Sequence, residues 1–147
     1  MLAPQAAVNQ GRAGSRSAAS LAKAEEANKV AFANHVIQYK SGVKIAFGTD
    51  TGVSAHGDNA QEFKLMVDAG MSPADAIKTA TVNAADLLGR SSTLGTLEPG
   101  KDADIVAVAK SPLSDVTQLE HPTFVMHRGV VAKQDGQRQA FPPNVNP

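Results

Sequence analysis

The chain of 147 residues is 42% apolar and 19% charged, which suits one soluble domain that buries roughly 70% of its unfolded surface. Its 14 basic residues equal its 14 acidic residues, so charge gives no basis for binding nucleic acid or an anionic membrane. Because the chain has no cysteine, disulfides, thiolate metal sites and thiol catalysis are excluded, and no apolar run approaches the roughly 20 residues of a membrane span.

The first 40 residues are expected to form a loose segment and then one helix. Residues 1–18 are rich in Ala, Gly, Ser and Gln without a period, so we expect them to be loose. They lack the apolar core of a secretory signal, and we expect a cytoplasmic protein by default, unless a signal precedes Met1. From Ser20, which can cap a helix, apolar residues recur at helical spacing as far as Tyr39, and Ser41-Gly42 is a typical helix end.

A short strand is expected next, followed by two more helices. Residues 43–47 contain a single polar side chain, a pattern typical of a strand that is covered on both faces. Asn59 and Glu62 form a capping-box arrangement at the start of a helix that Gly70 ends. Ser72 caps the following helix, whose first position is a proline and whose apolar stripe continues to residue 88.

The pattern changes to short strands after Arg90. Residues 105–108 are expected to form a strand, and residues 123–127 and 130–133 a hairpin around Arg128-Gly129, after a connecting loop at 112–122. Three acidic residues cluster just before the first strand, in residues 98–104. They suggest a metal site at first sight, but a tight turn leading into the strand explains them better.

The residues with candidate chemistry follow the predicted strand at 43–47. Asp50 stands at its C-terminal end, which in barrel enzymes is the end that carries the catalytic groups. It could accept a proton from water, or it could be a turn aspartate with local hydrogen bonds. His56 could contact a substrate, orient Asp50 or be a solvated loop residue. Asn59 is a further candidate for substrate contact, although capping explains it as well.

Several motifs, in the right order, resemble the C-terminal part of the metal-dependent amidohydrolases. They include Gly48-Thr49-Asp50, His56-Gly57-Asp58-Asn59 and Glu98-Pro99-Gly100-Lys101-Asp102, and the stretches that carry them are 42–50, 56–63, 69–77, 79–89 and 95–106. The resemblance covers roughly residues 25–133 and is strongest to the imidazolonepropionase-like and Xaa-Pro dipeptidase-like branch.

The resemblance implies an α/β fold: the C-terminal fragment of a (β/α)₈ barrel plus part of a small β-sandwich. Residues 1–18 would precede it, 19–90 would be the last part of the barrel, 91–135 the sandwich segment and 136–147 a polar tail. Asp50 would be the strand-end aspartate that binds a divalent metal, zinc in the first instance, and handles the proton of the attacking water. The implied reaction is hydrolysis of a C–N bond in a peptide-like or cyclic amide substrate, a small molecule or a dipeptide, with His56 and Asn59 as the substrate-binding candidates.

The chain departs from the family pattern in its histidines. It has no His-x-His pair, and His35, His121 and His127 match no ligand position of the family. One carboxylate cannot hold a catalytic zinc, which needs about three protein ligands. We therefore expect this chain to be inactive alone and to need the missing N-terminal barrel portion, or a second copy of itself.

Two alternatives remain open from the sequence. The chain could be a non-catalytic remnant or an association module that uses the same surfaces, because a lone barrel strand has two unpaired edges and should associate, rearrange or be poorly ordered. It could also be a self-contained α/β domain that binds a small molecule, which would require further strands within residues 1–39.

Overall fold

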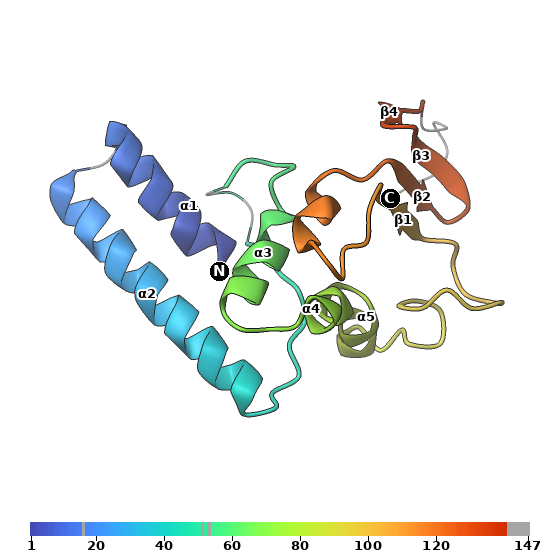
Figure 1. Cartoon of the computed structure of the whole chain (residues 1–147), viewed down its shortest axis with the longest axis horizontal. Coiled ribbons are helices and arrows are strands. Elements are labelled where there is room, and N and C mark those ends of the chain that lie inside the picture. Colours follow the sequence, from blue (N-terminus) through green and yellow to red (C-terminus); the bar gives the residue numbers. More distant parts are fainter. Residues whose placement is uncertain (16, 51, 53, 141–147) are drawn as a thin grey trace.

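A computed structural model of the chain describes residues 1–15, 17–50, 52 and 54–140. Two helices at the N-terminus, α1 (Leu2–Gln10) and α2 (Ala18–Lys40), form an antiparallel hairpin at one end of the molecule. A four-stranded sheet lies at the other end, and three short helices lie between them (Figure 1). Within this described part, no helix is both long and apolar enough to cross a bilayer.

The expectation of a loose segment at residues 1–18 is wrong for helix α1. Only two α1 side chains are buried, Leu2 and Val8, six positions apart among small residues, so the sequence shows no helical period there. The segment η1 (Gly11–Ser15) is kinked at Gly14, which has φ of 82°, between the two helices, and a Cβ on Gly11 would lie 2.7 Å from the side chain of Leu21. The cap of α2 is Ser17 rather than the predicted Ser20, because the Ser17 hydroxyl accepts a hydrogen bond from the Ser20 N–H.

The middle of the chain forms helices α3 (Gln61–Asp68), α4 (Pro73–Ala80) and α5 (Val82–Leu87). The predicted start of α4 is confirmed: Ser72 accepts a hydrogen bond of 3.1 Å from the Asp75 N–H, and the proline occupies the first turn. The single helix expected to continue to residue 88 is divided at Thr81, whose backbone (φ −122°, ψ −97°) is not helical.

The predicted capping box at Asn59 and Glu62 is wrong. Ala60 precedes α3 without a side-chain cap, and the Asn59 amide instead donates a hydrogen bond of 2.8 Å to the Thr49 hydroxyl. Glu62 turns into the interior, where 2% of its surface is exposed. Local spacing suggested the cap, whereas contacts with residues far along the chain decide where both side chains lie.

Residues 43–50 do not form the predicted strand. They are in no β-ladder, and the sheet of the described residues consists of β1–β4 alone. The segment runs instead beside α4 and α5: the Phe47 N–H donates to the Thr79 carbonyl (2.9 Å), and the Asn83 amide donates to the Ile45 carbonyl (2.8 Å). These two contacts give one backbone N–H and one backbone carbonyl of the segment a partner on a helix instead of on a strand.

The main apolar core lies beneath this extended segment. Its buried members are Met66, Met71 and Ala76, and half-buried side chains pack against them, among them Ile45 and Phe47. The rings of Phe47 and Phe63 contact each other with centroids 4.6 Å apart. Burial of these side chains therefore fixes the path of the chain up to the candidate site.

The C-terminal part is an antiparallel sheet in the order β1-β2-β3-β4, formed by β1 (Ile105–Ala107), β2 (Phe124–His127), β3 (Val130–Gln134) and β4 (Gln137–Arg138). The predicted strand at 105–108 and the predicted hairpin are confirmed, with His127 paired to Val130. The sequence did not predict β4, nor the 3₁₀-helix η2 (Val116–Glu120) inside the expected loop. Val116 of this helix is buried.

Candidate functional site

The extended segment ends at Asp50, the predicted catalytic and metal-binding residue. Thr49 is buried, whereas the Asp50 side chain is exposed. The backbone of Asp50 is left-handed, with φ of 51°, a conformation that aspartate tolerates better than most residues do. The turn at Asp50 therefore presents a carboxylate at the surface, directly after a buried anchor.

The loop that follows Asp50 is connected back to the end of the extended segment by Asn59. The Asn59 side chain is half-buried and donates to the hydroxyl of Thr49, the neighbour of Asp50. The Asn59 amide oxygen accepts a hydrogen bond from the Gly57 N–H (3.3 Å), which shapes the loop. His56 lies exposed on this loop, and among the described residues no hydrogen bond or ion pair joins it to Asp50. The structure thus joins Asn59 to Thr49, the neighbour of the predicted aspartate, and shows no such link for His56 among the described residues.

The described residues do not form a metal site. Nowhere in residues 1–15, 17–50, 52 and 54–140 do three His, Cys, Asp or Glu side chains gather closely enough to hold a metal ion. His35 is buried in α2, and Nδ1 of His127 in β2 forms a hydrogen bond of 2.9 Å with Asp104, just before β1. Asp50 can therefore supply one ligand, and a zinc ion would require about two more from outside the described part of this chain.

The acidic cluster at residues 98–104 has the structural role that the sequence favoured. The Lys101 N–H donates to the Glu98 carbonyl in a turn, and Asp102 forms an ion pair with Arg90. Asp104 accepts hydrogen bonds from the Arg128 N–H (2.8 Å) and bonds His127. Asp104 thereby holds the lead-in to β1 against the hairpin, and Asp102 ties the turn to Arg90.

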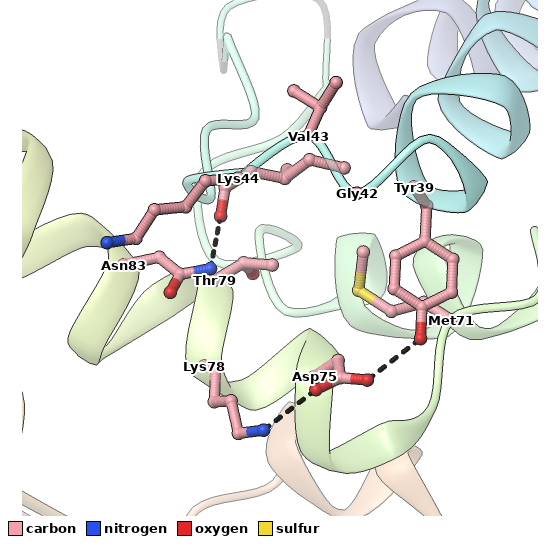
Figure 2. A pocket seen from close by; sticks show the side chains of 10 residues that line it. Tyr39, Gly42, Val43, Lys44, Met71, Asp75, Lys78, Thr79 and Asn83 are labelled. Carbon is pink, nitrogen blue, oxygen red and sulfur yellow. Dashed lines mark hydrogen bonds and ion pairs between the residues drawn. The ribbon is translucent and has the colours of Figure 1, made fainter.

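A small pocket of about 190 Å³ lies between the end of α2, residues 42–45, α4 and α5 (Figure 2). Asp75 lies at one side of it and accepts hydrogen bonds from Lys78 and Tyr39, both 2.9 Å long. Together with a third bond from Ser72, they lower the pKa of Asp75 to about 2, with Lys78 the largest contributor. None of the predicted site residues lines this pocket, and its charged side chains are already paired, Lys78 with Asp75 and Lys44 with Asp86, so it is not the candidate active site.

A buried polar cluster was not predicted from the sequence. The Glu62 carboxylate lies 2.8 Å from the ammonium of Met1 and also accepts the Leu2 N–H. His35 is 8% exposed, and its Nε2 atom is buried without a hydrogen-bond partner. Burial lowers the pKa of His35, the Glu62 charge opposes that effect, and the Met1 ammonium adds to it. The helical period places His35 on an inner face, whereas the bond between Met1 and Glu62 joins residues 61 positions apart in the sequence.

Comparison with known proteins adds independent findings. The model of the amidohydrolase family matches residues 4–133. Ochratoxinase of Aspergillus niger is 41% identical over 90 residues, which are 60% of this chain and 18% of that protein. Imidazolonepropionase of Geobacillus kaustophilus is 38% identical over 71 residues, which are 46% of this chain and 17% of that protein.

Solved structures resemble a larger share of the chain. The crystal structure of a Xaa-Pro dipeptidase with bound methionine in the active site has a TM-score of 0.79 and 34% identity, covering 89% of this chain and 33% of that one. That of a putative prolidase from Bifidobacterium longum has a TM-score of 0.79 and 28% identity, covering 94% and 35%. The chain thus spans about a third of these solved chains and less than a fifth of the two curated relatives.

Proposed function

Because this chain belongs to the amidohydrolase family, we propose that it is the C-terminal part of a hydrolase that cleaves a C–N bond in a small amide or dipeptide-like substrate. The resemblance predicted from the motifs is confirmed by the family match and by the imidazolonepropionase and Xaa-Pro dipeptidase relatives. The observation that carries the proposal is the placement of Asp50, an exposed carboxylate held at the end of a well-packed segment.

In the complete protein, residues 43–47 would be the last strand of a (β/α)₈ barrel, and β1–β4 would belong to the small β-sandwich. The likeness to about a third of a Xaa-Pro dipeptidase chain supports this arrangement. The missing neighbours of the segment would come from polypeptide outside this chain. Because these neighbours are missing, we infer that the chain alone is inactive.

Asp50 is the group that would take a proton from the attacking water and return it to the leaving nitrogen. A positioned acid–base group of this kind contributes roughly 10²- to 10⁴-fold to a rate. Asn59 would contact the substrate close to Asp50, where its bond to Thr49 holds it, and His56 would do so from the exposed loop. The complete protein would use a divalent metal, zinc in the first instance, but the described residues do not form a site for it, so Asp50 would be one ligand among others from outside.

The test uses a chimera in which this chain replaces the C-terminal third of the Xaa-Pro dipeptidase and is joined to the N-terminal two thirds of that enzyme. The chimera should bind zinc and hydrolyse a Xaa-Pro dipeptide, whereas the isolated chain should do neither. Asp50→Asn should lower kcat of the chimera by about 10²- to 10⁴-fold. Asp68→Asn, the same change at an exposed position of α3, is the matched control and should leave kcat unchanged.

Three results would count against the proposal. Stoichiometric zinc and turnover in the isolated chain would exclude the fragment interpretation. An unchanged kcat in Asp50→Asn would exclude the role of Asp50. A folded, zinc-loaded chimera without activity on Xaa-Pro dipeptides or cyclic amides would count against the proposed hydrolytic function.

The second candidate is a non-catalytic association module. Its support is the number of large apolar side chains that are exposed, including Leu87 (76%), Leu97 (75%) and Leu88 (67%). Surfaces of this kind mark interaction sites when they are contiguous. Sedimentation and zinc analysis of the isolated chain help to separate the hydrolase from the association module. Stable self-association without zinc binding would favour the module.

A further inference from the structure

The extended segment 43–50 has two backbone edges, and helices bind one of them. Successive residues of an extended backbone direct their N–H and C=O groups to alternate sides. On one side, the Val43 N–H, the Ile45 carbonyl and the Phe47 N–H form hydrogen bonds with α2, α5 and α4 respectively. The edge formed by these odd-numbered residues is therefore occupied.

The opposite edge is open. It is formed by the backbone groups of Lys44, Ala46 and Gly48, and within residues 1–15, 17–50, 52 and 54–140 these groups have no hydrogen bond. Lys44 and Gly48 are exposed, and Ala46 is half-buried. The two unpaired edges predicted from the sequence are thus reduced to one. An exposed edge with free N–H and C=O groups is a template for another strand.

The sheet offers weaker templates at its two ends. Strand β4 is two residues long, and β1 is three residues long with Asp102 and Asp104 just before it. Short length and adjacent charge are the usual means by which proteins blunt an edge strand. The open edge of residues 44–48 has a single charged residue, Lys44, and is therefore the better template.

We propose that two copies of this chain pair along residues 44–48 in an antiparallel arrangement, with the two-fold axis at Ala46. In this register Lys44 of each copy lies opposite Gly48 of the other, and the two Ala46 residues lie opposite each other. Each of these pairs can exchange both backbone hydrogen bonds, because all of them belong to the open edge. A two-fold interface of this kind uses the same surface on both copies and closes at the dimer.

Charge favours the antiparallel arrangement over the parallel one. Lys44 stands at the start of the open edge and Asp50 two residues beyond its end, and both are exposed. Antiparallel pairing makes Asp50 of one copy a diagonal neighbour of Lys44 of the other, at a spacing that long side chains can bridge. Parallel pairing in register would place each residue beside its own like charge. Ile45 and Phe47 keep their places on the core in either case.

The dimer would bring a residue of the second copy to the candidate site. Lys44 of that copy would lie beside Asp50, the proposed catalytic group. The same edge is where a further strand of the proposed barrel would lie, so the dimer and the barrel exclude each other there. Five paired residues bury less than the roughly 1,200 Å² of a standard interface, and we expect a weak dimer with a Kd of about 0.1 mM.

The first experiment measures sedimentation and amide hydrogen exchange of the full chain at about 20 μM and about 1 mM, on either side of the expected Kd. At the higher concentration the chain should be mostly dimeric, and the amides of Lys44, Ala46 and Gly48 should exchange more slowly. The amides of Val43 and Phe47 should exchange alike at both concentrations, because they are bound within one copy. A monomer at 1 mM would overturn the proposal, as would protection gained in β1 instead of residues 44–48.

Ala46→Pro tests the centre of the interface. Proline removes the N–H that each copy donates at the two-fold axis, and an extended backbone tolerates it where that N–H has no partner within the copy. Kd should rise at least tenfold, because two hydrogen bonds are lost. Unchanged protection of the Phe47 amide shows that the fold persists. Ala46→Ser, which keeps the N–H, is the matched control and should leave Kd within about twofold. A folded Ala46→Pro chain that still forms the dimer would overturn the proposal.

A charge cycle tests the register. Lys44→Gln and Asp50→Asn should each raise Kd by about two- to tenfold, and the double variant should raise it no further, because both changes remove the same pair. Asp86→Asn is the control, since it removes the partner that Lys44 has within its own copy at 2.7 Å, and it should not weaken the dimer. Independent effects of the two substitutions, or equal weakening by Asp86→Asn, would overturn the antiparallel register. None of these measurements involves zinc or substrate, so their failure would leave the proposed hydrolytic function untouched.

Discussion

Two stretches of this chain were predicted to be strands, and they differ in the partners of their backbone hydrogen bonds. The strands β1–β4 pair with one another within residues 105–138, each beside its neighbour in sequence. Residues 43–50 contact helices instead, through the Thr79 carbonyl and the Asn83 amide. An apolar run thus predicts an extended backbone, but a strand also needs a partner. Antiparallel partners lie close in sequence, whereas parallel ones follow a crossover of a dozen or more residues.

The largest expected effect comes from removing the core beneath residues 43–50. Met66 is 2% exposed and belongs to the cluster on which Ile45 and Phe47 pack. Met66→Ala should lower the free energy of unfolding by about 2–4 kcal/mol, because it removes buried surface and leaves a cavity. Urea denaturation measures the loss, and hydrogen exchange should show faster opening at residues 45–47 than in β2 and β3.

The control for Met66→Ala is Leu87→Ala, at a side chain that is 76% exposed. This substitution should change the free energy of unfolding by less than about 0.5 kcal/mol. If Met66→Ala weakened protection of the sheet as much as that of residues 45–47, the two extended stretches would unfold as one unit, and the contrast between them would fail.

The next prediction tests the side-chain hydrogen bond that residues 43–50 have in place of a β-ladder. Asn83 donates its amide to the Ile45 carbonyl at 2.8 Å, in a half-buried setting. Asn83→Ala should lower the free energy of unfolding by about 1–3 kcal/mol, because the carbonyl loses its donor. Asn34→Ala, at an exposed position of α2, should cost far less. Equal stability of the two variants would mean that packing alone holds the extended segment.

Acid titration of Asp75 tests the junction between α2 and α4, next to the start of the extended segment. The folded pKa of about 2 lies below the ordinary value of 3.8, so this group stabilises the fold fully above pH 3.8. Its contribution is lost as the pH falls from 3.8 towards 2. The gap in unfolding free energy between the native chain and Asp75→Asn should therefore shrink over that range, modestly because the side chain is 39% exposed.

Tyr39→Phe sharpens the same test. It removes one of the three side-chain donors to Asp75 and leaves Lys78 and Ser72 in place. The stability of Tyr39→Phe should therefore still depend on pH in this range, less strongly than that of the native chain and more strongly than that of Asp75→Asn. A gap that stays constant from about pH 2 to about pH 5 would show that Asp75 does not depend on these donors for its ionisation.

The sequence predicts those features that short-range chemistry decides. Ser72 followed by proline marks the start of α4, and Arg128-Gly129 marks the turn of the hairpin, because in both cases the partners lie within a few residues. The position of Asp50 after an extended segment was predicted for the same reason, and its role as catalyst and metal ligand stays a prediction, as do the roles of His56 and Asn59. The division of the chain into domains also stays a prediction.

Three of the failures concern contacts that local sequence does not show. Glu62 looked like a capping residue because its true partners, Met1 and Leu2, are some 60 residues away. Helix α1 was missed because its stability comes from two buried side chains rather than from a period. The strand at 43–47 was predicted from its own composition, which cannot tell whether a neighbouring strand exists.

The smallest effect concerns the turn of the hairpin. Arg128 has φ of 47° and Gly129 has φ of 80°, so both are left-handed, as in the two-residue turns that favour Asn-Gly. Arg128→Asn keeps the backbone N–H that donates to Asp104 and should raise the free energy of unfolding by about 0.5 kcal/mol. Arg128→Ala, which keeps a Cβ but offers no side-chain amide, should give no gain.

In Arg128→Asn, hydrogen exchange should slow in β2 and β3 and stay unchanged at residues 43–47, because no ladder connects these residues with the sheet. Slower exchange at residues 43–47 would instead reveal a coupling between the two extended stretches that their separate hydrogen-bond partners do not provide.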